Sequence, residues 1–215
     1  MQAKPILIFI GKFLLAFIVL STIYHFVLNR PYTNLFGGTI KMMYNGTFGE
    51  NGKRDVLLPG VKNNNTDQVK VFLLDDKMIQ QYQQARAAGQ NVQFTPPVIK
   101  IDTWIQAAIY LVFFLSLVIA TATDWKRALI AIGIGLFILH LFLVFKTGLR
   151  LQFEAANTGI GGTSLQGFGG SILTFLHNLF RLANFNLLIA LILWLSLTFK
   201  VGDFQKIKQR LFSIN

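Results

Sequence analysis

Two pairs of basic side chains stand out against an apolar background, and each pair has helical spacing. Lys146 and Arg150 are four residues apart, and so are His177 and Arg181; Glu154 follows Arg150 one turn later. Side chains four apart on a helix share one face, so each pair would present its charges together. Ammonium and guanidinium groups bind phosphate and carboxylate strongly, which makes the four basic residues candidates for binding an anionic group.

The two pairs are predicted to meet at one level of a membrane. Lys200 marks the cytoplasmic end of the last apolar run, and Arg181 precedes it by nineteen residues, which is roughly 28 Å along a straight helix and about one hydrocarbon thickness. The preceding helix runs the other way and would bring Lys146 and Arg150 to the same outer boundary. In an alternative interpretation, the four side chains extend separately to the outer lipid head groups.

The elements that would position these residues are membrane helices. The chain is 53% hydrophobic and 13% charged, with a mean hydropathy of +0.52, whereas a soluble domain carries about 25% charged residues. Four apolar runs have lengths near the ~20 residues that cross a bilayer; they are residues 6–28, 104–122, 127–146 and 179–199. The first run reaches residue 28 with no small-residue cleavage site, which favours an uncleaved anchor.

Basic residues in the short segments predict the orientation. Lys126 and Arg127 lie between the second and third runs, Lys4 and Lys12 lie near the N-terminus, and residues 200–215 form a basic tail. Short basic segments stay in the cytoplasm. We therefore expect a multipass protein of the bacterial cytoplasmic (inner) membrane with both termini in the cytoplasm. The net charge of +11 then indicates anionic lipid head groups as partners and not nucleic acid.

The long segment between the first two runs, residues 30–103, is too long and too patterned for a linker. Apolar residues alternate over 69–73, which predicts a half-buried strand. A helical pattern then ends at Gly89, a residue type typical of helix C-termini. Pro96 and Pro97 restrict the next extended segment to a sheet edge. We expect a small α+β domain with a strand–helix–strand order.

The predicted fold is thus an α-helical membrane protein with four transmembrane helices and a small α+β extracytoplasmic domain between the first and second. Residues 1–29 form the anchor, 30–103 the outer domain, 104–199 a three-helix transmembrane region and 200–215 the cytoplasmic tail. The Gly-rich segment 155–171 lacks the Lys-Ser/Thr ending and the preceding strand of a phosphate-binding loop. It is predicted to be a flexible outer loop.

Other residues have structural interpretations beside chemical ones. Ala131 and Gly135 form a small-xxx-small pair that allows helices to pack closely. His140 lies among apolar residues, where a hydrogen bond to a neighbouring helix is its usual role. Haem or pigment binding through His140 or His177 is the alternative.

The residue types present exclude several kinds of chemistry. The chain has no cysteine, which excludes disulfides, thiolate metal ligands and a cysteine nucleophile. No His-Glu-x-x-His motif or histidine pair at metal spacing is present. We therefore predict no metal site, no cofactor and no catalytic residue.

The segment "IATATDWKRALIAIGIGLFILHLFLVFKTGLR" and the polar-headed last run resemble the C-terminal half of the exosortase/archaeosortase group and its membrane-bound associated proteins. In that group a basic turn precedes a helix with an Asn-x-x-Arg-type ending, and a later helix brings a histidine to the outer face. Arg150 matches the arginine and His177 the histidine, while Thr147 replaces the asparagine. Those enzymes are cysteine transpeptidases. The resemblance therefore implies an exosortase-like or exosortase-associated protein without the nucleophile.

Two functions follow as hypotheses. The first is a non-catalytic accessory or structural subunit of a larger bacterial envelope complex, with other membrane protein subunits as partners and the outer domain as contact surface. The alternative is an enzyme or carrier acting on an anionic lipid-linked substrate at the outer membrane interface. In that case Arg150, His177 and Arg181 would bind the head group, and His177 would be the acid/base.

Overall fold

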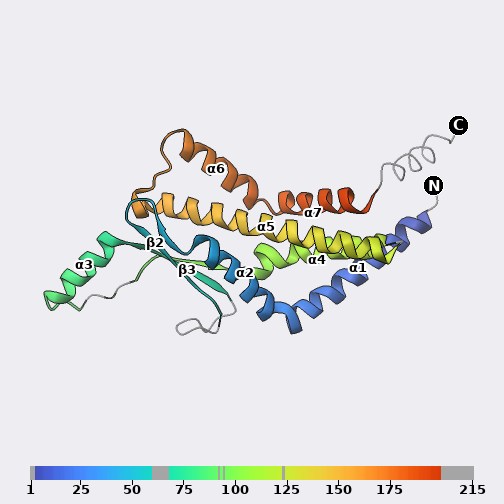
Figure 1. Cartoon of the computed structure of the whole chain (residues 1–215), viewed down its shortest axis with the longest axis horizontal. Helices are drawn as coiled ribbons and strands as arrows, with labels where there is room; N and C mark the ends of the chain where they lie inside the picture. The colour runs from blue at the N-terminus through green and yellow to red at the C-terminus, as the bar shows by residue number, and fades with distance from the viewer. Residues whose placement is uncertain (1–2, 60–67, 92, 94, 123, 200–215) are drawn as a thin grey trace.

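A computed structural model of the chain describes residues 3–59, 68–91, 93, 95–122 and 124–199. The described chain is mostly helical, with long helices side by side and a small sheet at one end (Figure 1). The predicted tail and Lys200 lie outside the described residues.

Three helices of the described chain are long and apolar enough to cross a membrane. The first candidate span is Ile6–Tyr44. It contains most of α1 (Ala3–Ile23), the π-helical η1 (Tyr24–Leu28) and α2 (Asn29–Tyr44). The second consists of the π-helical η2 (Trp104–Ala108) and α4 (Ile109–Thr121). The third is α5 (Trp125–Thr158). Exposed leucines, isoleucines and phenylalanines cover α1 and much of α5, as expected for helices that face lipid.

Two of these helices extend beyond their predicted ends. The first run was expected to end at residue 28, but the helix continues through η1 into α2, which turns away from α1 (Figure 1). A π-helical segment is a common place for a helix to change direction. The third apolar run was predicted over residues 127–146, and α5 continues beyond it to Thr158, which keeps Lys146, Arg150 and Glu154 on one helix as their spacing predicted.

The predicted fourth span, residues 179–199, is not one straight helix, but its residues belong to two helices that together are long and apolar enough to form one bent span. The chain forms α6 (Gly167–Arg181) and α7 (Ala183–Thr198), with 74° between them. Leu182 has an extended conformation at the break. The Asn186 side-chain amide donates hydrogen bonds to the carbonyls of Phe180 at 3.1 Å and Leu182 at 3.0 Å. The depth of Arg181 therefore cannot be counted back from Lys200 along one helix.

A four-stranded antiparallel sheet lies between α2 and η2 in the sequence, with the order β1-β2-β3-β4. The strands are β1 (Gly46–Phe48), β2 (Gly52–Leu57), β3 (Val69–Asp75) and β4 (Val98–Ile101). The predicted strand–helix–strand order is confirmed, because α3 (Asp76–Ala87) joins β3 to β4. Gly89 follows α3 with φ +73°, and β4 is at a sheet edge, as its preceding prolines predicted.

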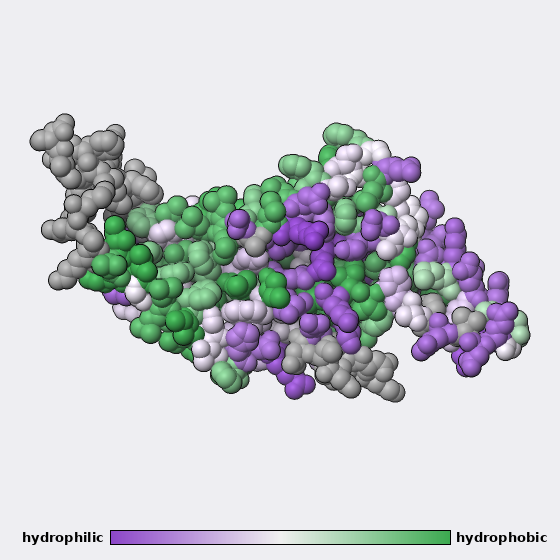
Figure 2. All heavy atoms as spheres, turned by 180° about the vertical axis from the view of Figure 1, so that it is seen from behind, coloured by the Kyte–Doolittle hydropathy of each residue, from purple (hydrophilic) through white to green (hydrophobic). Residues whose placement is uncertain are grey.

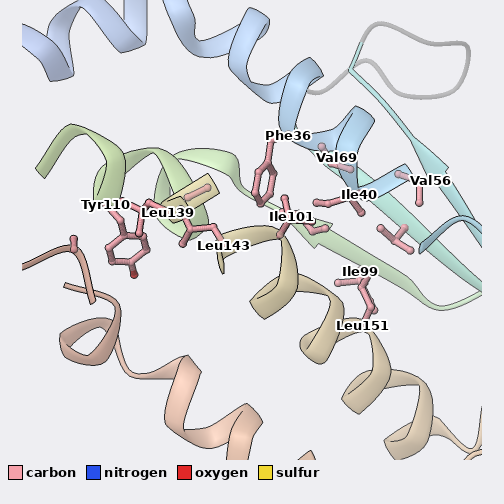
Figure 3. Close-up of a cluster of buried hydrophobic side chains, with 14 of the residues drawn as sticks. Phe36, Ile40, Val56, Val69, Ile99, Ile101, Tyr110, Leu139, Leu143 and Leu151 are labelled. Carbon is pink, nitrogen blue, oxygen red and sulfur yellow. The ribbon is translucent and has the colours of Figure 1, made fainter. Parts of the chain in front are cut away.

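One face of the sheet shares a core with the helices. The alternate residues Val69, Val71 and Leu73 of β3 are fully or almost fully buried. Their cluster includes Phe36 and Ile40 from α2 and side chains from α5. Figure 3 shows Val69 beside Phe36 and Ile40, between the sheet and the helices. The sheet is thus held by packing on α2 and α5, because a sheet this small has little core of its own.

The Gly-rich connection between α5 and α6 covers residues 159–166 and is shorter than the predicted loop over 155–171. It contains the short 3₁₀ helix η3 (Ile160–Gly162). The backbone N–H of Glu50 donates to the Gly161 carbonyl at 3.0 Å, and the Gly161 N–H donates to Asp75 Oδ2 at 3.1 Å. These two hydrogen bonds therefore attach the connection to the sheet region at Gly161.

Asp75 provides a test of this attachment. The Gly161 N–H and then the Lys77 N–H hold the pKa of the Asp75 carboxyl below its ordinary value, because both stabilise the charged form. The pKa of Asp75 is lower in the folded than in the unfolded protein. The stabilisation by the charged Asp75 carboxylate is therefore present above the unfolded pKa of about 3.9. It is lost as the pH falls through the folded pKa.

Asp75→Ala should remove the N-cap of α3 together with the link to Gly161. We expect a loss of about 1 kcal/mol in the free energy of unfolding at pH 7 and faster amide hydrogen exchange at Gly161. Asp76→Ala is the control, because Asp76 is the adjacent residue in the first turn of α3. Equal effects of the two variants would contradict the assigned link.

Candidate anion-binding site

A pocket of about 450 Å³ lies among η2, the start of α4, the C-terminal half of α5 and the C-terminal end of α6. We call it the basic pocket, and its lining consists of Ile105, Gln106, Tyr110, Lys146, Thr147, Leu149, Arg150, Glu154, His177, Phe180 and Arg181. All four basic residues that the sequence singled out therefore line one pocket.

Helix α5 supplies one charged wall. Lys146, Arg150 and Glu154 follow at four-residue intervals on one face of the helix and are each partly buried. Lys146 Nζ lies over the Tyr110 ring of α4, 5.1 Å from the ring centroid. This cation–π contact orients the ammonium group without neutralising it.

Helix α6 supplies the facing wall. His177 and Arg181 are one turn apart on α6, and both reach the pocket. The His177 ring stacks on Phe153 of α5, with the centroids 3.9 Å apart and the planes at 7°. Phe180 packs against Phe142 of α5, with ring centroids 5.6 Å apart. Aromatic contacts between α5 and α6 thus set the distance between the two charged walls.

The basic pocket has more positive than negative charge. Lys146, Arg150 and Arg181 are its cations, and Glu154 is its one carboxylate. Within the residues that the structure describes, no salt bridge joins these cations to an acidic side chain. With histidine neutral, two positive charges are in excess. Lys146 and Arg150 are partly buried and Arg181 is exposed, and Glu154 balances only one of the three charges. Partly buried cations whose charge is not fully balanced favour the binding of an anion, because an anion restores the interactions lost with water.

The part of α5 that precedes the basic pocket can be compared in length with a hydrocarbon core. Lys146 follows Trp125, the first residue of α5, by twenty-one residues of continuous helix. This corresponds to ~32 Å at 1.5 Å per residue, close to the ~30 Å of a hydrocarbon core. Viewed from behind, the surface over the long apolar helices is largely hydrophobic, and hydrophilic residues gather over the middle of the molecule and over the end with the sheet and α3 (Figure 2).

Some pocket residues were not recognised as site residues in the sequence. Gln106 and Tyr110 come from η2 and α4, far from α5 along the chain, and no spacing rule connects the two elements. Glu154 carried a usable signal, because it is four residues after Arg150. Phe153, which supports His177, had no signal that distinguished it from other phenylalanines.

The remaining residues singled out in the sequence lie away from the basic pocket. Gly135 is buried on α5, and a Cβ atom there would overlap the Phe114 ring of α4; Ala131, one turn earlier, is also buried. His140 Nε2 lies 3.3 Å from Thr39 Oγ1 of α2. This is the interhelical hydrogen bond expected as the usual role of such a histidine.

Neither a metal site in the described part of the chain nor a known relative identifies the ligand of the basic pocket. Among the described residues, no group of three or more His, Cys, Asp or Glu side chains is placed to bind a metal ion. Comparisons with models of protein families, curated protein sequences and solved structures found no match to this chain. The resemblance to the exosortase/archaeosortase group therefore stays a prediction.

Proposed function

We propose that this chain is a multipass membrane protein whose basic pocket binds an anionic group at the membrane interface. The observation that carries the proposal is the grouping of Lys146, Arg150 and Arg181 around one pocket of about 450 Å³ without a salt bridge among the described residues. If these side chains extended separately to lipid head groups, they would not be expected to line the same pocket.

The position along α5 supports a site at the interface. If Trp125 lies at one boundary of the hydrocarbon core, Lys146 lies at the other, because the intervening helix is one core thickness long. Charges at this level keep contact with the head-group layer, so they need not be neutral. The positive-inside rule would place this boundary on the outer face of a bacterial cytoplasmic membrane.

The proposal favours the hypothesis of an anionic, lipid-linked substrate over that of a non-catalytic accessory subunit. In an accessory subunit, the anion would be an acidic side chain of a partner. Arg150 and His177, the residues that carry the resemblance to the exosortase group, both line the basic pocket. The pocket accounts for binding, and we assign no catalytic role to its residues.

Binding of phosphate compounds to the purified full chain in neutral detergent tests the proposal. The probes are radiolabelled phosphatidic acid and inorganic phosphate. Each cation that contacts the bound anion contributes about 1.5–3 kcal/mol, so we expect Lys146→Gln and Arg150→Gln each to weaken binding about tenfold or more. The double variant should weaken it at least as much as either single one.

Arg86→Gln is the control, because it removes an exposed cation from α3. It should leave the affinity unchanged. If neither probe binds, or if Arg86→Gln weakens binding as much as Arg150→Gln, the proposed anion site is wrong.

A further inference from the structure

Helix α6 has an apolar stripe on the side away from the basic pocket. Phe168, Ile172 and Phe175 are 83%, 42% and 65% exposed. Their spacing of four and three residues places them on one face of the helix. His177 and Arg181 lie on the opposite face and line the basic pocket. A single helix thus separates an exposed apolar surface from a charged site.

The orientation of α6 fits a helix that lies along a membrane surface. Helix α7 is apolar apart from Asn184, Asn186, Ser196 and Thr198, and α6 makes an angle of 74° with it. If α7 follows the membrane normal, α6 therefore lies nearly in the membrane plane. It has no acidic residue, and its last turn carries Arg181. An apolar face with phenylalanines opposite a basic face is typical of interfacial helices.

We infer that α6 is an interfacial helix whose apolar stripe enters the lipid, and that the ligand of the basic pocket is a membrane amphiphile with a phosphate head group. The inference rests on the proposed function and specifies the class of ligand. Because α6 separates the lipid-facing stripe from the pocket, a ligand would reach the cations around the helix, past the exposed Ile105 side chain of the pocket lining.

The lining of the basic pocket fits such a ligand. The excess of two positive charges matches a phosphate monoester or a diphosphate better than a single carboxylate. Ile105, Leu149 and Phe180 provide an apolar part of the lining, and Ile105 is 62% exposed. These side chains would contact the first carbons of a tail, while Lys146 and the two arginines bind the head.

The position of α6 can be measured with single cysteines, because the chain has none of its own. Phe175→Cys carries a fluorescent label on the apolar stripe, Gln84→Cys carries it at an exposed position of α3, and Phe137→Cys carries it on the lipid-facing side of α5. In liposomes containing spin-labelled lipids, the Phe175 label should be quenched nearly as much as the Phe137 label. Quenching no greater than at Gln84 would overturn the inference.

The class of ligand is tested by comparing two probes on the unmodified chain. Phosphatidic acid should bind at least tenfold more tightly than inorganic phosphate, because only the lipid fills both the charged and the apolar lining. Equal affinities would overturn the amphiphile while leaving the proposed anion site intact. If neither probe binds, the proposed function itself fails, and the inference fails with it.

Discussion

Replacing Gly148 by alanine should push α2 and the sheet away from α5. Gly148 is buried on α5, and a Cβ atom there would overlap the ring of Tyr44, the last residue of α2. Alanine would force the partly buried Tyr44 ring out of its place between α2 and α5, so we expect a loss of about 1–3 kcal/mol in the free energy of unfolding. Thermal unfolding in neutral detergent measures the loss.

Gly133→Ala is the matched control for this substitution. Gly133 is on the same helix, but nothing lies within 4 Å of a Cβ atom there. Alanine is the better helix former, so this variant should be neutral or stabilising by up to about 1 kcal/mol. Similar melting temperatures for the two alanine variants would show that Tyr44 and Gly148 are not in close contact.

A second substitution in the same contact separates a local clash from general disturbance of the helix. Tyr44→Ala removes the ring that a Cβ atom at position 148 would meet. The double variant should therefore lose less stability than the sum of the two single variants, because residues in contact are energetically coupled. Additive losses would contradict the packing described.

Asn186→Leu should destabilise the break between α6 and α7. Asn186 is fully buried, and its amide donates to the carbonyls of Phe180 and Leu182. Leucine has a similar size but no donor, so both carbonyls would lose a partner where little water reaches them. We expect a loss of about 1–3 kcal/mol in the free energy of unfolding.

Asn184→Leu is the control for this experiment, because Asn184 is exposed near the start of α7. It should change the stability little. Asn186→Leu should in addition weaken phosphatidic acid binding, since the orientation of α6 positions His177 and Arg181. If both leucine variants melt at the temperature of the unmodified protein, the assigned role of Asn186 at the break is wrong.

Features set by local spacing were predictable from the sequence. The alternation over β3, the helical pattern of α3 and the glycine at position 89 all appear as predicted. The pairs Lys146–Arg150 and His177–Arg181 were likewise recognisable, because the helical repeat alone places residues four apart on one face. The apolar composition and run lengths also indicated helices able to cross a membrane, as three of the described helices are.

Features that depend on contacts between distant segments became visible only in the tertiary structure. The break at Leu182 is stabilised by Asn186, and the continuation of the first helix into α2 is held by packing on α5 and the sheet. The approach of Tyr110 to Lys146 joins segments thirty-six residues apart in the sequence. The sequence by itself determined which residues share a helix face and which helices are apolar. Only the tertiary structure decided which faces meet, because side-chain packing and buried hydrogen bonds between distant segments have no period along the chain.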